Sequence, residues 1–137
     1  MQAAYAQMAA AASRRDVSGW LSYKSDDFVS VGLDGREVGL ASRRAMLTML
    51  LGTVHSLKTD TRVLALDLLG PDRAKAKIRE HTEMTFTRFD KNESKAVFDT
   101  VAEATWIKTP AGWRESRCRS LSEKGTLDGK PLPKPGM

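Results

Sequence analysis

The 137-residue chain has little cysteine and histidine and no long apolar run. Its one cysteine, Cys118, excludes an intramolecular disulfide framework. No group of histidine, cysteine and acidic residues has the spacing of zinc ligands, and we expect no metal site. No apolar stretch approaches the roughly 20 residues that span a bilayer, so we expect no membrane partner.

Several functional motifs are also missing. The sequence has no nucleophile elbow, no glycine-rich phosphate loop and no dinucleotide fingerprint, so we expect no cofactor. The N-terminal MQAAYAQMAAAASRR lacks the order of a basic segment followed by an apolar core that marks a signal peptide. No feature fixes the compartment. A cytoplasmic location is slightly favoured, and export from a longer precursor stays an alternative.

The positive charge of the chain is dispersed. The net charge is +5 and the pI is near 9.6, but lysines and arginines occur in ones and twos among acidic residues. Phosphate binding requires a clustered basic surface. We therefore interpret the charges as a solvated surface and expect no nucleic-acid partner.

Helical patterns occupy the first part of the chain. Residues 2–15 are rich in helix-forming alanine, glutamine and methionine. Asp16 is a suitable N-cap for a short second helix, and Ser42 for a third that stops near Gly52. A strand is expected over residues 28–33, between the second and third helices.

From about residue 57 the apolar period changes to two. Four long strands are expected, over residues 57–69, 73–89, 95–108 and 113–123. Helices in one block and strands in another predict an α+β fold, with the helices packed in the concave face of a curved, mainly antiparallel sheet. We expect one domain over residues 1–123 and a loose tail over 124–137, which is rich in proline and glycine.

The last two strands have two different faces. A turn at residues 109–112 places Ile107 opposite Glu115 and Thr105 opposite Arg117. The inward face then consists of small and aromatic residues, namely Phe98, Thr100, Ala102, Ala104, Trp106, Ser116, Cys118 and Ser120. Charged residues, Glu115 among them, occupy the outward face, because burying an unpaired charge is unfavourable.

Aromatic walls, small residues and a few polar groups are typical of small-molecule sites. Parity and position predict a pocket lined by Trp20, Phe28, Ser30, Glu80, Thr82, Met84, Phe98, Thr100, Ala102, Trp106, Cys118 and Ser120. The alternative is an ordinary filled core, in which Trp20, Met46 and Leu50 occupy the same space.

Glu80 interrupts the apolar face of its strand. A carboxylate that faces a cavity has a raised pKa and can act as a general base or as an acidic hydrogen-bond donor. Glu80 is therefore the candidate catalytic residue. The alternative is a glutamate that reaches solvent or pairs with an arginine. Cys118 is expected to be an inert buried thiol.

The order of these elements resembles a known superfamily. The segments RDVSGWLSYKSDDFVSV and DGRE, a helix rich in leucine and methionine, and a terminal W-x6-W-R are similar to nuclear-transport-factor-2-like proteins. The SnoaL-like and ketosteroid-isomerase-like branches are the nearest. The resemblance implies a cone-shaped, cystatin-like barrel with an internal pocket, and a homodimer formed through the outer face of the sheet.

The resemblance also indicates what is missing. The catalytic aspartate of ketosteroid-isomerase-like proteins falls on Gly32, and their oxyanion tyrosine falls near Met8. In carboxylate-binding relatives arginines stand where this chain has Ala104 and Ser120. The implied ligand is a small neutral or weakly polar molecule.

Three functions follow from this pattern. The first is a non-catalytic domain that binds a small molecule in a mostly apolar pocket. The second is an enzyme of the isomerase, dehydratase or cyclase type with Glu80 as general base. The third is a structural dimerisation module.

Overall fold

The computed structural model describes residues 2–88, 90 and 92–132. Three helices and seven strands follow one another along the chain: α1 (Gln2–Ser13), α2 (Val17–Trp20), β1 (Lys24–Val31), β2 (Glu37–Gly39), α3 (Leu40–Thr53), β3 (Val54–Gly70), β4 (Arg73–Thr87), β5 (Glu93–Thr109), β6 (Gly112–Leu127) and β7 (Lys130–Pro131). Asp16 caps α2 as predicted, since its Oδ1 accepts a 2.9 Å hydrogen bond from the Gly19 amide.

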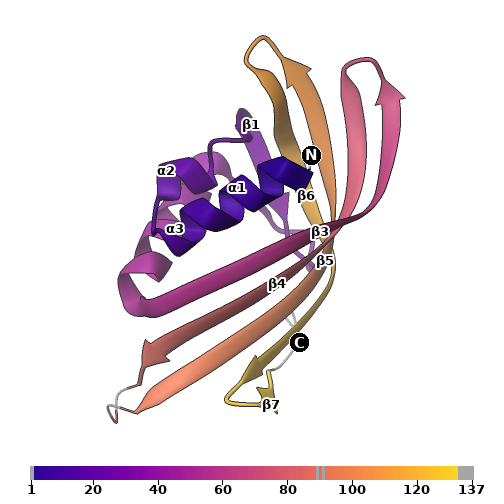
Figure 1. The fold of residues 1–137 in the computed structure, drawn as a ribbon. Coiled ribbons are helices and arrows are strands. Elements are labelled where there is room, and N and C mark those ends of the chain that lie inside the picture. Colours follow the sequence, from indigo (N-terminus) through magenta and orange to yellow (C-terminus); the bar gives the residue numbers. More distant parts are fainter. Residues whose placement is uncertain (1, 89, 91, 133–137) are drawn as a thin grey trace.

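The strands form one curved sheet in the order β2-β1-β6-β5-β4-β3, with β7 attached to β6. All neighbouring pairs are antiparallel except β1 with β6. Figure 1 shows the three helices gathered on the concave side of this sheet. The α+β fold is confirmed. The sheet does not close into a barrel, because β2 and β3 are its two free edges.

The sheet extends beyond the predicted end of the domain. Strand β6 continues to Leu127, which pairs with Ala96, and β7 then pairs back onto β6. The prediction of a loose tail is therefore wrong for residues 124–131. The expectation for residues 133–137 lies outside the described residues.

Gly125 explains how β6 can continue past Phe98. The two residues pair directly across β5 and β6. A Cβ atom on Gly125 would lie 2.8 Å from two carbons of the Phe98 ring. Only glycine lets the ring lie flat over the neighbouring strand at this position.

The alanine-rich helix α1 covers one half of the concave face. Tyr5 and Met8 pack against a floor of small residues on β4 and β5. Ala76 and Ala104, at the centre of this floor, have no exposed surface. Because the side chains on both surfaces are small, the helix approaches the sheet closely, and this half of the concave face is a filled core.

A second apolar cluster joins the other end of α1 to α3 and the start of β3. It contains Ala12, Leu51, Val54 and Leu57, and Trp20 packs against both clusters. Met46, which the sequence placed in the core, is 52% exposed instead. Helix α3 begins at Leu40 rather than at a Ser42 cap, and this shift accompanies the short strand β2 that the sequence did not indicate.

The hairpin of β5 and β6 follows the predicted register only in part. Thr105 pairs with Arg117 and Glu103 with Arg119, as expected. A bulge at residue 116 then shifts the pairing, so that Trp106 faces Glu115. One extra residue reverses the alternation of faces in the rest of the hairpin. The predicted outward position of Glu115 is therefore wrong.

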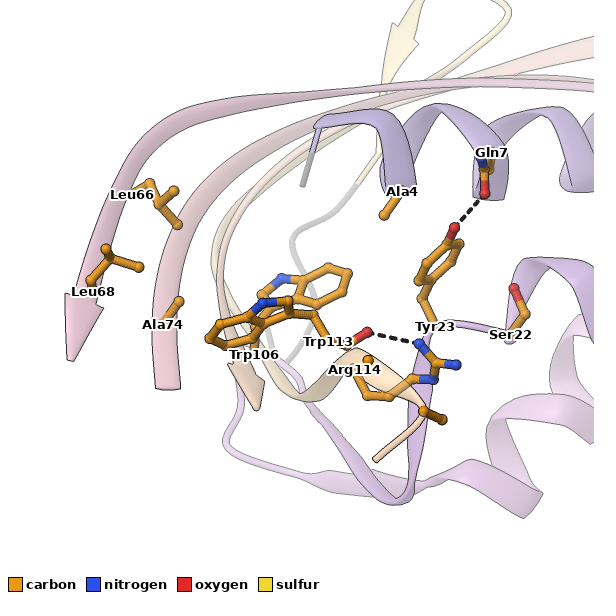
Figure 2. A pocket seen from close by; sticks show the side chains of 12 residues that line it. Ala4, Gln7, Ser22, Tyr23, Leu66, Leu68, Ala74, Trp106, Trp113 and Arg114 are labelled. Carbon is orange, nitrogen blue, oxygen red and sulfur yellow. Dashed lines mark hydrogen bonds between the residues drawn. The ribbon is translucent and has the colours of Figure 1, made fainter. Parts of the chain in front are cut away.

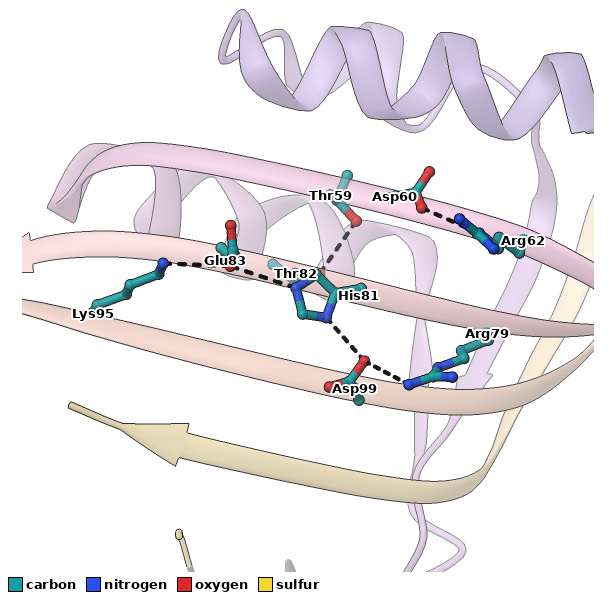
Figure 3. A network of polar contacts seen from close by, with 9 residues as sticks. All are labelled: Thr59, Asp60, Arg62, Arg79, His81, Thr82, Glu83, Lys95 and Asp99. Atoms are coloured by element: carbon teal, nitrogen blue, oxygen red, sulfur yellow. Dashed lines mark hydrogen bonds and ion pairs between the residues drawn. The ribbon is translucent and has the colours of Figure 1, made fainter. Parts of the chain in front are cut away.

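The convex face of the sheet holds a network of exposed charges, which Figure 3 shows around His81. His81 Nδ1 lies 2.9 Å from Asp99, and Arg79 lies 3.5 Å from the same carboxylate. The hydrogen bond to Asp99 raises the pKa of His81. Exposed pairs of this kind contribute roughly 0–1 kcal/mol each, so the network orders the surface more than it stabilises the fold.

Candidate functional site

A buried polar network lies between α1, β1 and the hairpin of β5 and β6. The Glu115 side chain is 1% exposed, and its Oε1 is 2.5 Å from the ammonium of Lys24. The Tyr5 hydroxyl donates to Glu115 Oε2 at 2.8 Å and accepts from Trp106 Nε1 at 3.1 Å. Each buried polar group in this network has a partner, which is the condition for polar groups to be tolerated in a core.

The surroundings fix the protonation of Tyr5. Burial, followed by the negative charge of Glu115, raises the pKa of the Tyr5 phenol far above its usual range. The phenol therefore remains a hydrogen-bond donor to the carboxylate. The Lys24 ammonium also lies 4.7 Å from the centre of the Phe28 ring, which adds a cation–π contact.

Glu80 projects from the middle of β4 on the concave side. It pairs with Thr61 on β3 and Thr100 on β5, and its side chain is half-buried. Loss of hydration raises the pKa of Glu80, although the positive charges of Lys24 and Arg43 act in the opposite direction. Glu80 is neither a strand-end residue in bulk water nor a partner in the ion pairs of the described residues.

The predicted site residues separate into two groups in the structure. Phe28, Ala102 and Trp106 are buried in the packed core. The others are half-buried on the concave side or at its rim: Trp20, Ser30, Glu80, Thr82, Met84, Phe98, Thr100, Cys118 and Ser120. We call the concave-side region around Glu80, Thr82, Thr100, Cys118 and Ser120 the Glu80 hollow, a name that rests on the half-buried state of these residues and not on a cavity volume.

Strand pairing brings the members of the Glu80 hollow together. Glu80 lies beside Thr100, Thr82 beside Phe98, and Ser30 beside Cys118. Burial raises the pKa of the Cys118 thiol to about 12, which keeps it protonated at neutral pH. Hydroxyl and thiol groups thus share the concave side with Glu80, and Glu123, which pairs with Thr100, brings a second carboxyl group to the same row.

A groove lies at the N-terminal end of α1, near the tips of the β3–β4 and β5–β6 hairpins. This groove has a volume of about 750 Å³. Figure 2 shows Leu66, Leu68, Trp106 and Trp113 on one side, and Tyr23 and Arg114 on the other. Of the predicted ligand-binding residues, only Trp106 lines it. The sequence therefore did not locate this groove.

Lys24, Tyr5 and Glu115 were not among the predicted site residues. Lys24 and Glu115 belong to segments rich in charged and polar residues, and such segments indicate surface positions. The bulge that turns Glu115 inward leaves no recognisable mark in the sequence. In the part of the chain that the structure describes, no three histidine, cysteine or acidic side chains are placed to hold a metal ion, and no helix is long and apolar enough to cross a membrane.

No family model and no curated protein matches the sequence. Solved structures do match. A scytalone dehydratase-like protein from Novosphingobium aromaticivorans has a TM-score of 0.76 at 8% identity, over 88% of this chain and 81% of that chain. A ketosteroid isomerase-like protein from Erwinia carotovora atroseptica has a TM-score of 0.60 at 21% identity, over 88% and 92%. A domain of unknown function with a cystatin-like fold from Nostoc punctiforme has a TM-score of 0.66 at 16% identity, over 87% of this chain and 72% of that chain.

These likenesses extend over most of each chain at low sequence identity. They show that the chain has the cystatin-like α+β fold of these proteins, the fold that the resemblance in the sequence implied. Proteins with this fold include some named as enzymes and some of unknown function. The fold alone therefore does not assign an activity.

Proposed function

We propose that the protein binds a small neutral or weakly polar molecule in the Glu80 hollow. The observation that carries this proposal is that a row of inward-facing side chains beside Glu80 remains half-buried, whereas α1 completely covers the alanine floor. Met84 and Phe98 supply apolar surface there, and Thr82, Thr100 and Ser120 supply hydroxyl groups that can orient a ligand.

A neutral ligand suits the charges around the hollow. Lys24 is already paired with Glu115 and lies only 14% exposed. The raised pKa of Glu80 favours its uncharged form, which can donate a hydrogen bond to a carbonyl or hydroxyl oxygen. A strongly anionic ligand would find the Lys24 ammonium already neutralised by Glu115.

Native mass spectrometry of the protein purified from its own source tests the binding function. We expect a retained small molecule in the wild-type protein and none in Thr100→Phe, whose side chain fills the hollow from β5. A Thr105→Phe variant, altered on the opposite face of the same strand, serves as the matched control and should retain the molecule. A wild-type protein that carries no molecule contradicts the proposal.

A second candidate is an enzyme in which Glu80 transfers a proton. The position of Glu80 favours it, since a half-buried carboxyl group whose pKa is raised by loss of hydration can act as a proton donor or acceptor. Similar structures include proteins named as dehydratase-like and ketosteroid isomerase-like. A Glu80→Gln variant separates the two functions. If Glu80 is catalytic, the variant retains the unconverted substrate, which differs chromatographically from the molecule retained by the wild-type protein. If the protein only binds, both proteins retain the same molecule.

Glu80→Gln also has a predicted effect on stability. Because the pKa of Glu80 is raised by folding, the native state holds its proton more tightly than the unfolded chain does. Wild-type stability should therefore fall as the pH rises from the ordinary glutamate pKa through the raised one. The variant is neutral at every pH and should lose this decline and be more stable above that range.

Thermal unfolding of wild type and Glu80→Gln at several pH values between 4 and 8 measures this effect. Glu103→Gln, altered on the convex face, is the control and should keep the wild-type decline. A Glu80→Gln protein with an unchanged pH slope, or one less stable than wild type at pH 8, would show that Glu80 is well hydrated in the native state.

We also propose that two copies of the chain associate through the convex face. Val97, Val101 and Ile107 form a half-buried apolar row between the charged side chains of this face. Val101→Asp should convert a dimer into a monomer in light scattering coupled to size-exclusion chromatography, and Val101→Thr should not. A wild-type protein that is monomeric at micromolar concentration would refute this association.

A further inference from the structure

The groove at the hairpin tips has one apolar side and one polar side. Its apolar side is built from Leu66 and Leu68 of the edge strand β3, together with Ala74, Trp106 and Trp113. Leu66 is 48% exposed and Leu68 is 73% exposed, which is unusual for leucines on the concave side of a sheet. The groove therefore presents apolar surface that the chain itself leaves in water.

Helix α1 explains why this surface remains uncovered. The Gln2 side chain donates to the Thr61 carbonyl at 2.6 Å and accepts from the Val63 amide at 3.0 Å. The side-chain amide thereby pairs with one carbonyl and one N–H group on the edge of β3, as the backbone of a neighbouring strand would. The helix begins here, so beyond Val63 nothing in the described chain covers the inner side of β3, and Leu66 and Leu68 face the groove (Figure 2).

The opposite side of the groove is polar and carries one cation. Arg114 Nη1 donates to the Trp113 carbonyl at 2.9 Å, and the guanidinium lies 5.7 Å from the Tyr23 ring centre. The ion pairs of the described residues do not include Arg114. One backbone carbonyl satisfies one of its five N–H donors, so most of the guanidinium is available to an acceptor.

Tyr23 holds this cation in place. Its hydroxyl donates to the Gln7 side chain, and its backbone carbonyl accepts a 2.6 Å hydrogen bond from the Glu115 amide. The ring is thus fixed between α1 and β6, and the guanidinium lies over it. A cation held beside an apolar wall is the arrangement that recognises an amphipathic anion.

We propose that this groove is a second binding site, distinct from the Glu80 hollow, for a small amphipathic carboxylate. The apolar body of the ligand lies against Leu66, Leu68 and Trp113, and its carboxylate pairs with Arg114. The volume of about 750 Å³ is in the range of small-molecule sites. An uncharged molecule of the same shape gains the apolar contacts but not the ion pair.

Titration with 2-naphthoate and with the uncharged 2-naphthamide tests the proposal. Tryptophan fluorescence follows binding, since Trp113 lines the groove, and amide chemical shifts of residues 66–68 and 113–114 locate it. We expect the wild-type protein to bind 2-naphthoate about tenfold more tightly than 2-naphthamide, as suits a charge-assisted pair that adds about 1.4 kcal/mol. The preference should weaken as salt is added.

Variants assign the recognition to individual residues. Arg114→Gln should reduce the affinity for 2-naphthoate to that for 2-naphthamide and leave the amide unaffected. Leu68→Asp, at an exposed position that tolerates a polar residue, should abolish 2-naphthoate binding. Arg117→Gln, on the same strand but on the convex face, should behave as wild type.

Two results would overturn the proposal. In one, the acid and the amide bind equally and Arg114→Gln changes neither affinity. In the other, neither compound perturbs the groove residues at millimolar concentration. Both results leave binding in the Glu80 hollow untouched, because retention of a molecule there is measured separately with Thr100→Phe.

Discussion

Replacing Lys24 with methionine is expected to lower the free energy of unfolding by about 3–5 kcal/mol, the usual loss when one partner of a buried ion pair is removed. Methionine keeps the length and apolar stem of lysine, so packing against Phe28 changes little. The variant loses only the ammonium that lies 2.5 Å from Glu115. The Glu115 carboxylate then remains buried with only the Tyr5 hydroxyl as a partner.

The double variant Lys24→Met, Glu115→Leu distinguishes a lost pair from lost packing. Removing both charges eliminates the unpaired carboxylate, so the double variant should recover a large part of the stability that Lys24→Met loses. Urea unfolding followed by circular dichroism gives the free energies. Lys75→Met is the control: its 3.4 Å pair with Glu103 is exposed, and its loss should change the free energy of unfolding by less than about 1 kcal/mol.

If Lys24→Met is as stable as wild type, Glu115 is solvated and the buried network does not exist as described. If the double variant is less stable than Lys24→Met alone, the pair makes a net favourable contribution that apolar side chains cannot replace.

The alternation of side chains predicted the architecture because it is a local property. Ala74 and Ala76 on β4, and Ala102 and Ala104 on β5, are each two residues apart, and all four are buried in the cluster that contains Tyr5 and Met8 of α1. The Ala-rich first helix and the small residues on β4 and β5 are complementary. Each pattern can be recognised separately in the sequence, and a helix packed on a curved sheet is the arrangement that buries both.

The register of the last hairpin could not be derived in the same way. A β-bulge adds one residue to a strand without changing the composition of the sequence around it. The bulge at Ser116 turned Glu115 inward, and a second irregularity between Ala102 and Val101 brings Glu123 opposite Thr100. Nothing local marks either position, since the energetic reason for the first is a distant pair with Lys24.

The Glu80 hollow and the groove differ in how far each could be predicted from the sequence. Glu80 could be recognised because a charge on an apolar face is anomalous in the sequence itself. The groove could not be recognised, because Leu66 and Leu68 look like ordinary core residues. Among the described residues, the contacts of α1 with β3 reach Val63, and Leu66 and Leu68 lie exposed beyond them. Coverage by a distant element is a tertiary property.

Two residues on the concave face of β5 should respond differently to a larger side chain, because Ala104 is fully buried and Thr100 is half-buried. Ala104→Leu is expected to lower the free energy of unfolding by about 1–3 kcal/mol, because the added carbons meet Tyr5, Met8 and Trp106 where no space remains. If the alanine floor bordered a cavity, the larger side chain would fill it and stabilise the protein by about 0.5–2 kcal/mol instead.

Thr100→Leu is the matched comparison, four residues earlier on the same face of β5. Thr100 is half-buried beside Glu80, so its larger replacement enters the hollow and should change the free energy of unfolding by less than about 0.5 kcal/mol. Urea unfolding of both variants in one buffer gives the comparison. Both substitutions place a leucine on the concave face of β5, although Ala104→Leu adds three carbons and Thr100→Leu replaces a hydroxyl with a larger alkyl group. Equal losses would show that the concave face is filled throughout and would eliminate the space in which Glu80 could meet a ligand.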